Sequence, residues 1–227
     1  MQLPLVPRGM PARAWPPVLA TRGPAGPCTW HSHHSLRFAL ALEGDVRIRT
    51  TREGKWSTAA GVLTAPDAEH LLDAGGRELL LVFLDPESVT GTPFRDALSG
   101  PVRLISDAER NAMTRDVVPR TILRSGAAAW ARQAAETLHL PPPAAARSVH
   151  PRVRALLSLL RSGGIAEATS LAVLARAVGL SPSRLMHVFT SSVGIPLRPY
   201  LAWLRVQRAA IDIVSGNSLG EAALAAG

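Results

Sequence analysis

The chain has 227 residues, a mass of 24.1 kDa and 47% apolar residues, which is enough for one large domain or two small ones. Its longest apolar run, residues 79–84, is too short to cross a membrane, and its single cysteine, Cys28, excludes an internal disulfide. We therefore expect a cytoplasmic protein with no membrane partner. The formal net charge is +8, and residues 141–227 carry nine basic but only three acidic groups. This basic segment favours nucleic acid as a partner, although a solvated cationic face would have the same charge.

The first part of the chain has the pattern of short strands. Residues 1–14 are broken by prolines and lack the apolar run of a signal peptide, so they are expected to form an N-terminal tail. Strands are predicted at residues 36–42 and 46–50, joined by a turn at 43–45, then around Trp56, at 62–65 and at 78–84. A second turn is expected at residues 73–76. Short antiparallel strands at this spacing predict a small barrel or sandwich over residues 15–100.

The second part of the chain has the pattern of helices. The helical pattern starts at Asp107, is clearest over residues 127–138, and defines a helical connector over 101–140 that we expect to mediate dimerisation. Three prolines from Pro141 to Pro143 begin a Pro/Ala-rich linker, residues 141–150. The remainder, residues 151–227, is expected to be all helical. The predicted fold class is thus α+β.

An internal repeat gives the most specific signal. Residues 170–179 and 218–227 share five of ten positions, and each copy runs from a serine suited to cap a helix to a glycine suited to a left-handed turn. After the first copy, Ser181 provides another N-cap and Pro182 fits the first position of a new helix. Helix, glycine turn and helix make a helix-turn-helix unit. One copy could be an ordinary helical hairpin, but two copies in a basic region favour DNA binding.

The residues LARAVGLSPSRLMHVFTSSVGIPLRPYLAWLRVQRAA closely resemble the DNA-binding domain of bacterial AraC-type transcriptional regulators, over about residues 151–227. The segments HSHHS, ALEGDV and GVLTAPDAEH resemble the cupin sensor domain of that family. The resemblance implies an N-terminal cupin-like antiparallel β-barrel, a helical connector and a C-terminal helix-turn-helix domain. It also implies a sequence-specific regulator that binds double-stranded DNA as a homodimer and responds to a small-molecule effector.

The helix expected from Pro182 to about Ser191 would read the DNA. Its apolar stripe, Leu185, Val188 and Phe189, docks on the preceding helix. In the family, positions matching Ser183, Met186 and His187 point at base edges, whereas those matching Ser181 and Thr190 lie near phosphates. His187 could instead contact a phosphate or only solvent, and many relatives carry arginine or glutamine at these sites. The candidate DNA contacts are Ser181, Ser183, Arg184, Met186, His187 and Thr190.

A long helix is expected next, over residues 197–214. Two apolar stripes suit a helix packed between subdomains and leave Arg205 and Arg208 for solvent or phosphate. The family pattern then stops at Gly227, before a second recognition helix. We therefore expect an incomplete second unit, a frayed segment at residues 219–226, and weak DNA binding by this chain.

The sensor half also invites comparison with catalytic cupins. Those bind a metal through an H-x-H pair, a glutamate and a later histidine, and His31, His33 and His70 could match the three histidines. Arg37 and Phe38 occupy the region of the expected glutamate, and an arginine would repel a divalent cation. We predict no metal, no cofactor and no enzyme activity; structural histidines and a pocket for an effector remain alternatives. The candidate pocket residues are Trp30, His31, His33, Arg37, Phe38, Trp56 and His70.

The sequence therefore predicts a transcription regulator with two rival interpretations. One rival is a metal-dependent cupin enzyme with a helical appendage, which requires a stoichiometric metal. The other is a shortened protein that pairs with full-length relatives and blocks them, which requires stable mixed dimers.

Overall fold

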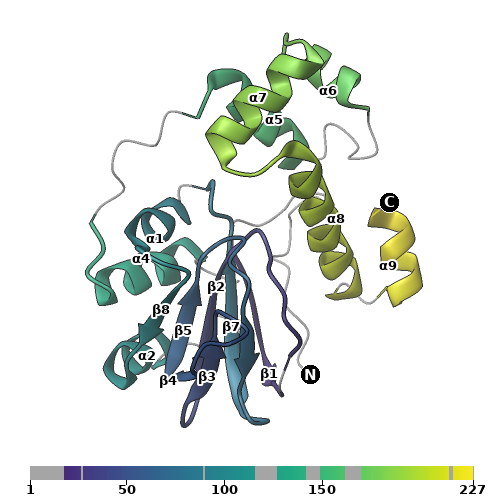
Figure 1. Cartoon of the computed structure of the whole chain (residues 1–227). Coiled ribbons are helices and arrows are strands. Elements are labelled where there is room, and N and C mark those ends of the chain that lie inside the picture. Colours follow the sequence, from purple (N-terminus) through teal and green to yellow (C-terminus); the bar gives the residue numbers. More distant parts are fainter. Residues whose placement is uncertain are drawn as a thin grey trace. The chain divides into compact units, whose positions relative to one another are not determined.

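The computed structural model describes residues 18–26, 28–88, 90–115, 127–141, 149–161, 170–214 and 217–226 (Figure 1). The predicted tail and most of the predicted linker lie outside these residues. The chain forms two compact units, one on each side of residues 144 and 145. Among the helices that the structure describes, none has the length and apolarity needed to cross a membrane.

The N-terminal unit contains two antiparallel sheets. The register of the central strand β2 (Leu36–Ala41) is fixed on both sides, since Phe38 lies opposite Val82 on one neighbouring strand and opposite Leu63 on the other. The larger sheet has the order β1 (Val18–Pro24), β7 (Glu78–Leu84), β2 (Leu36–Ala41), β5 (Gly61–Thr64) and β8 (Val102–Ile105), and the smaller has the order β4 (Ser57–Ala59), β3 (Val46–Arg49) and β6 (Leu71–Asp73).

Most of the strand predictions agree with this topology, and the differences have physical reasons. The strands predicted at residues 36–42, 46–50, 62–65 and 78–84 are present within about one residue, and Gly44 takes the left-handed φ of +67° that its turn requires. Strands β1 and β6 were not predicted. Residues 102–105, which we assigned to the helical connector, form β8 beside β5. This four-residue strand buries only Ile105, so it carries little periodicity, and the helical part begins at Asp107 as predicted.

The two faces of the larger sheet bury different layers. Three helices, α1 (Thr92–Ala97), α2 (Asp107–Thr114) and α4 (Ala127–Thr137), pack on one face (Figure 1). On that side the Phe38 ring meets Phe94 and Trp130 edge to face, with both centroid distances at 5.3 Å. The other face packs on the smaller sheet through small residues such as Ala39 and Val46. Successive residues of β2 therefore point into different environments.

The C-terminal unit is all helical, and its helices are α5 (Pro151–Arg161), α6 (Leu171–Ala177), α7 (Pro182–Val193), α8 (Leu197–Val214) and α9 (Leu219–Ala226). Helices α5 to α8 share one core. As predicted, Leu185, Val188 and Phe189 of α7 are buried in it. The Phe189 ring packs on Tyr200 of α8 with centroids 5.3 Å apart. This core fixes the orientation of α7 and so decides which of its side chains stay outside.

The turn between α6 and α7 has the predicted local geometry. Ser170 Oγ and Ser181 Oγ accept hydrogen bonds from Val173 N and Arg184 N, so both serines cap their helices. Gly179 has a φ of +68°, the left-handed conformation predicted for it. The predicted terminal glycine of the second copy, Gly227, lies outside the described residues.

The expectation that residues 219–226 are frayed is wrong for the structure, because they form helix α9 against α8 (Figure 1). Ser218 and Glu221 make the capping box that the repeat predicts, with Ser218 N donating to Glu221 Oε2 at 2.8 Å. Ala222 and Ala226 are buried. Small alanines allow two helices to approach closely, so this face packs without large side chains.

Helix α8 differs in part from its prediction. One of the two predicted apolar stripes includes Leu197 and Leu204, which are buried as expected, but Val206 of the other predicted stripe is 59% exposed. Arg208 does not remain for phosphate, because its Nη2 donates to the carbonyl oxygen of Leu160 at 3.0 Å. Arg208 thus donates to one of the last carbonyl groups of α5, which the helix itself does not pair internally.

Candidate nucleic-acid interface and histidine cluster

The solvent-facing side of α7 carries all six residues predicted to contact DNA. Every one of them is exposed, including Met186 at 48%. Their exposure follows from the burial of the opposite stripe on α5 and α6, which leaves this side without a protein partner among the described residues. The six residues are Ser181, Ser183, Arg184, Met186, His187 and Thr190.

The start of α7 is suited to bind an anion. Ser181 caps the helix, Pro182 occupies its first turn without an N–H group, and no acidic residue lies in that turn. The remaining free N–H groups and the helix dipole present partial positive charge to solvent. A phosphate oxygen placed there would be held by backbone donors and by the Arg184 side chain.

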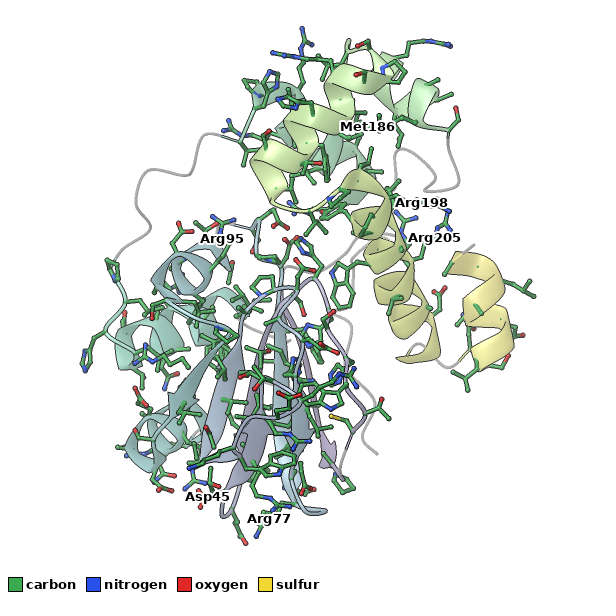
Figure 2. The ribbon with its side chains drawn as sticks, viewed as in Figure 1. Asp45, Arg77, Arg95, Met186, Arg198 and Arg205 are labelled. Carbon is green, nitrogen blue, oxygen red and sulfur yellow. The ribbon has the colours of Figure 1, made fainter. Side chains whose placement is uncertain are left out.

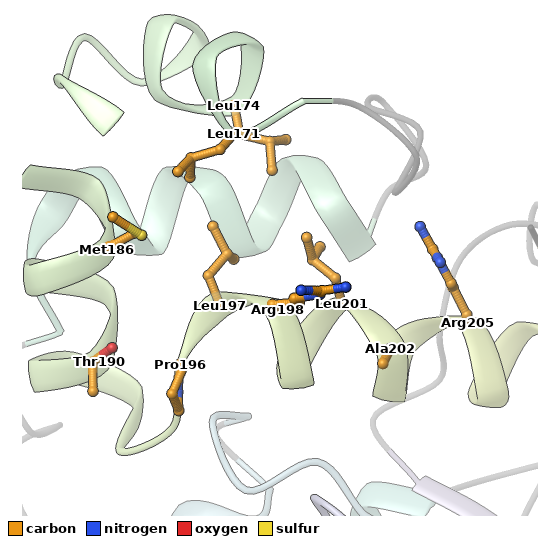
Figure 3. A pocket seen from close by; sticks show the side chains of 10 residues that line it. All are labelled: Leu171, Leu174, Met186, Thr190, Pro196, Leu197, Arg198, Leu201, Ala202 and Arg205. Carbon is orange, nitrogen blue, oxygen red and sulfur yellow. The ribbon is translucent and has the colours of Figure 1, made fainter. Parts of the chain in front are cut away.

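A groove between α6, α7 and α8 adjoins the DNA-facing side. It has a volume of about 820 Å³ and includes Met186 and Thr190 from the predicted set. Figure 3 shows Leu197 and Leu201 of α8 pointing toward α6 across this groove. Arg198 and Arg205 also line it from α8 (Figures 2 and 3).

Arg198 is a candidate contact that sequence reasoning missed. It is exposed on the first turn of α8 and lines the same groove as Met186. It lies between Leu197 and Pro199 at the start of α8, where the sequence gave no periodic signal. Only the spatial neighbourhood of α7 and α8 identifies it.

In the N-terminal unit, the structure brings His31, His33 and His70 together. One nitrogen from each ring lies within 4.8 Å of the others. His31 and His70 are held by two backbone hydrogen bonds across a β-bridge, and their ring centroids are 4.5 Å apart. The predicted association of these three histidines therefore holds in space.

Arg37 closes this cluster from β2. Its Nη1 lies 3.2 Å from His31 Nε2, and its Nη2 lies 2.5 Å from His70 Nε2. In both rings Nδ1 lies at hydrogen-bond distance from a backbone carbonyl oxygen. His31 Nδ1 is 2.8 Å from Thr29 O, and His70 Nδ1 is 2.8 Å from Ala68 O. A carbonyl only accepts, so Nδ1 carries the proton and Nε2 accepts from the guanidinium.

The cluster combines the Arg37 cation with two imidazoles, His33 and His70, that are neutral at pH 7. Burial, together with the Arg37 charge, lowers the pKa of His33 to about 3 and that of His70 to about 4. Burial also lowers the pKa of Arg37 to about 10, which still leaves it charged at neutral pH. The cationic centre of the cluster is therefore supplied by the chain itself.

A catalytic metal does not fit this arrangement. Imidazole nitrogens converge as ligands would, but two of them already accept from a guanidinium, and like charges repel. None of the described carboxylates joins the three histidines in the cluster. The three remaining candidate pocket residues lie elsewhere: Phe38 is in the core on the opposite face of β2, and Trp30 and Trp56 stack on the arginines Arg47, Arg49 and Arg52.

A second histidine site was not predicted, although its residue lies within HSHHS. His34 is 5% exposed; its Nδ1 lies 2.7 Å from Asp67 Oδ2 and its Nε2 lies 3.4 Å from Glu87 Oε1. Burial alone would lower the pKa of His34, but the hydrogen bonds to Asp67 and Glu87 outweigh it and raise the pKa to about 9. Asp67 holds a left-handed φ of +60° at this site.

The comparisons with known proteins concern the fold. No protein-family model matches the chain, and neither does any curated protein sequence. Among solved structures, ToxT from Vibrio cholerae superposes with a TM-score of 0.55 at 7% identity, over 93% of this chain and 90% of ToxT. ToxT with a bound unsaturated fatty acid gives 0.50 at 10% identity, over 92% and 86%. The AraC-like transcriptional activator CuxR gives 0.41 at 13% identity, over 91% and 81%. The chain thus shares the mixed α/β fold of ToxT over most of its length.

Proposed function

We propose that the chain is a sequence-specific, DNA-binding transcription regulator of the AraC type and not an enzyme. The observation that carries the proposal is α7, a capped helix fixed by its buried stripe with every candidate contact exposed. The basic, acid-poor composition of residues 141–227 supplies the attraction to a duplex. The resemblance of this segment to AraC-type domains supports the same assignment.

The roles of the side chains follow from their places on α7. Ser181 and the free N–H groups beside it contact a phosphate, as does Thr190. Ser183 and His187 offer hydrogen bonds to base edges, and Met186 offers an apolar contact to a thymine methyl group. Arg184 and, as an addition from the structure, Arg198 provide cationic contacts to the backbone.

The N-terminal unit is proposed to be a cupin-like sensor that binds a small-molecule effector, and the connector to support a homodimer. Residues within HSHHS and GVLTAPDAEH support the assignment, as does the antiparallel arrangement of the two sheets. ToxT, which has the same fold, has been crystallised with an unsaturated fatty acid. Effector binding would change DNA affinity by coupling the two units.

Selection of duplexes from a random pool by the purified chain tests the proposal. Enriched and scrambled duplexes are then compared by fluorescence anisotropy at low salt, because phosphate contacts weaken as salt rises. His187→Ala should weaken binding to the enriched duplex by about 5- to 100-fold and change the scrambled duplex little, as expected for a lost base contact.

Arg184→Ala should weaken binding to both duplexes and reduce the salt dependence, as a lost phosphate contact does. The matched control is Arg52→Ala, which removes an exposed arginine from the N-terminal unit. Enrichment of no sequence, or equal effects of Arg184→Ala and Arg52→Ala, would contradict the proposal.

A further inference from the structure

Arg37 is a buried cation that pairs with no carboxylate among the residues that the structure describes, although the Cys28 thiol is close enough to raise its pKa against the effect of burial. Arg37 is only 6% exposed, and the two described hydrogen-bond partners of its guanidinium are imidazole nitrogens of His31 and His70. Its Nε, which is also a donor, is buried with no hydrogen-bond partner there. The nearby carboxylates are committed elsewhere, since Glu69 pairs with Arg52 and both Asp67 and Glu87 pair with His34.

A charge in this position is costly unless an anion compensates for it. Removing an ion from water loses its hydration, and neutral acceptors restore only part of that energy. The guanidinium has five donors in a planar fork, of which the two described hydrogen bonds use two. The unused donors match the two oxygens of a carboxylate.

The histidines around Arg37 connect this buried cation with the surface of the N-terminal unit. His31 and His33 are half-buried, so the cluster extends to the surface of the unit. Next to it, the His33 ring meets the half-buried Phe83 ring edge to face, at a centroid distance of 5.9 Å. A buried guanidinium near half-buried aromatic rings is suited to a molecule with one acidic group and an apolar body.

We propose that Arg37 is the receptor for the carboxylate of a small organic acid, whose apolar part lies against His33 and Phe83. The inference rests on the proposed sensor function and names the chemical class of its effector. It also accounts for the histidines: their Nε2 atoms hold the guanidinium in place for the acid instead of holding a metal.

Titration calorimetry of the full chain without DNA tests this proposal. The probes are benzoate and hexanoate, each paired with its neutral amide, benzamide or hexanamide. At least one acid should bind at least tenfold more tightly than its amide. Arg37→Met, which keeps an unbranched apolar stem but removes the guanidinium and its charge, should remove that preference. Arg22→Met is the matched control, since Arg22 is a surface arginine paired with Glu78, and it should keep the preference.

Two further measurements guard against a merely structural role of Arg37. Without a ligand, Arg37→Met should melt at or above the temperature of the unmodified chain, because an uncompensated charge has been removed. Arg37→Lys, which keeps the charge but not the fork, should retain a weakened preference for the acid. A large drop in the melting temperature of Arg37→Met, with binding unchanged in Arg37→Lys, would overturn the proposal.

Other results would also overturn it. These are equal binding of acids and amides, no binding of either acid, or stoichiometric binding of Zn²⁺ by the unmodified chain at micromolar concentration. DNA binding is measured separately with the α7 variants. If the chain binds no specific DNA, the calorimetric result still stands as a ligand site, and if no acid binds, the DNA result is unaffected.

Discussion

Two buried cations lie three residues apart in the sequence and are compensated in opposite ways. His34 is charged because Asp67 and Glu87 surround it, and its pKa rises to about 9. Among the described residues Arg37 donates hydrogen bonds to imidazoles and pairs with no carboxylate, and its charge lowers the pKa values of His33 and His70 in addition to the effect of burial. Adjacent histidines, His33 and His34, thus differ in protonation at neutral pH.

The difference shows how a buried ionisable group can have either a structural or a receptive role. His34 has a carboxylate oxygen near each of its ring nitrogens, so the described residues supply the opposite charge. Arg37 has donors left over after its contacts with His31 and His70, so a ligand can complete it. A buried charge with carboxylate partners points to stability, and a buried charge without them points to binding.

The largest expected effect comes from breaking the compensated site. Glu87→Gln should lower the free energy of unfolding at pH 7 by about 2 to 3 kcal/mol, because it removes one partner of a buried charge while Asp67 remains. Urea denaturation measures this change. The control Glu53→Gln removes an exposed carboxylate from the same unit and should have an effect within about 0.5 kcal/mol. Equal effects of the two variants would show that His34 is not held by Glu87.

The pH dependence of stability should distinguish the two sites, because the pKa of His34 is raised whereas those of His33 and His70 are lowered. The folded pKa of His34, about 9, exceeds the ordinary value of 6.5. Its contribution is therefore complete below pH 6.5 and is lost as pH rises from 6.5 to about 9. His33 and His70 have folded pKa values of about 3 and 4, so their contribution is complete above pH 6.5 and is lost as pH falls.

These opposite signs predict a maximum of stability near pH 6.5. Each histidine contributes a slope of about 1.4 kcal/mol per pH unit within its window. The measurement is urea denaturation at pH values from about 5 to about 9, which covers the alkaline window and the upper part of the acid window. His34→Gln should remove the alkaline decline, whereas His70→Gln should reduce the acid decline. A decline above pH 6.5 that persists in His34→Gln would contradict the assignment.

Much of the fold follows from local patterns in the sequence. The mostly apolar run of residues 36–42 before a turn and the capping serines Ser170 and Ser181 predict elements that the structure contains. Strands β1, β6 and β8 depend on partners far away in sequence: β8 pairs with β5, about forty residues earlier, a separation that reflects tertiary pairing. Local periodicity carries no information about such pairing.

In the candidate sites, too, local sequence patterns predict some features, whereas contacts between distant residues determine others. The exposed face of α7 follows from helical spacing, since burying Leu185 and Val188 leaves Met186 and His187 outside. Phe38 was expected in the effector pocket, but alternation along β2 places it on the opposite side from Arg37. The pairing of His34 with Glu87 joins residues more than fifty positions apart, so no spacing rule could have identified it.

The smallest expected effect concerns a third way of accommodating an arginine, by stacking on indole rings. The half-buried Arg49 lies 5.5 Å from the ring of Trp30 and 5.1 Å from that of Trp56, whereas the exposed Arg52 stacks on Trp30 alone. Arg49→Met should lower the free energy of unfolding by about 1 kcal/mol, and Arg52→Met by less than about 0.5 kcal/mol, because a desolvated cation–π contact is stronger than an exposed one. Urea denaturation at low and high salt measures both. If Arg52→Met has the larger effect, its ion pair with Glu69 outweighs stacking, and indole faces do not compensate buried charge in this unit.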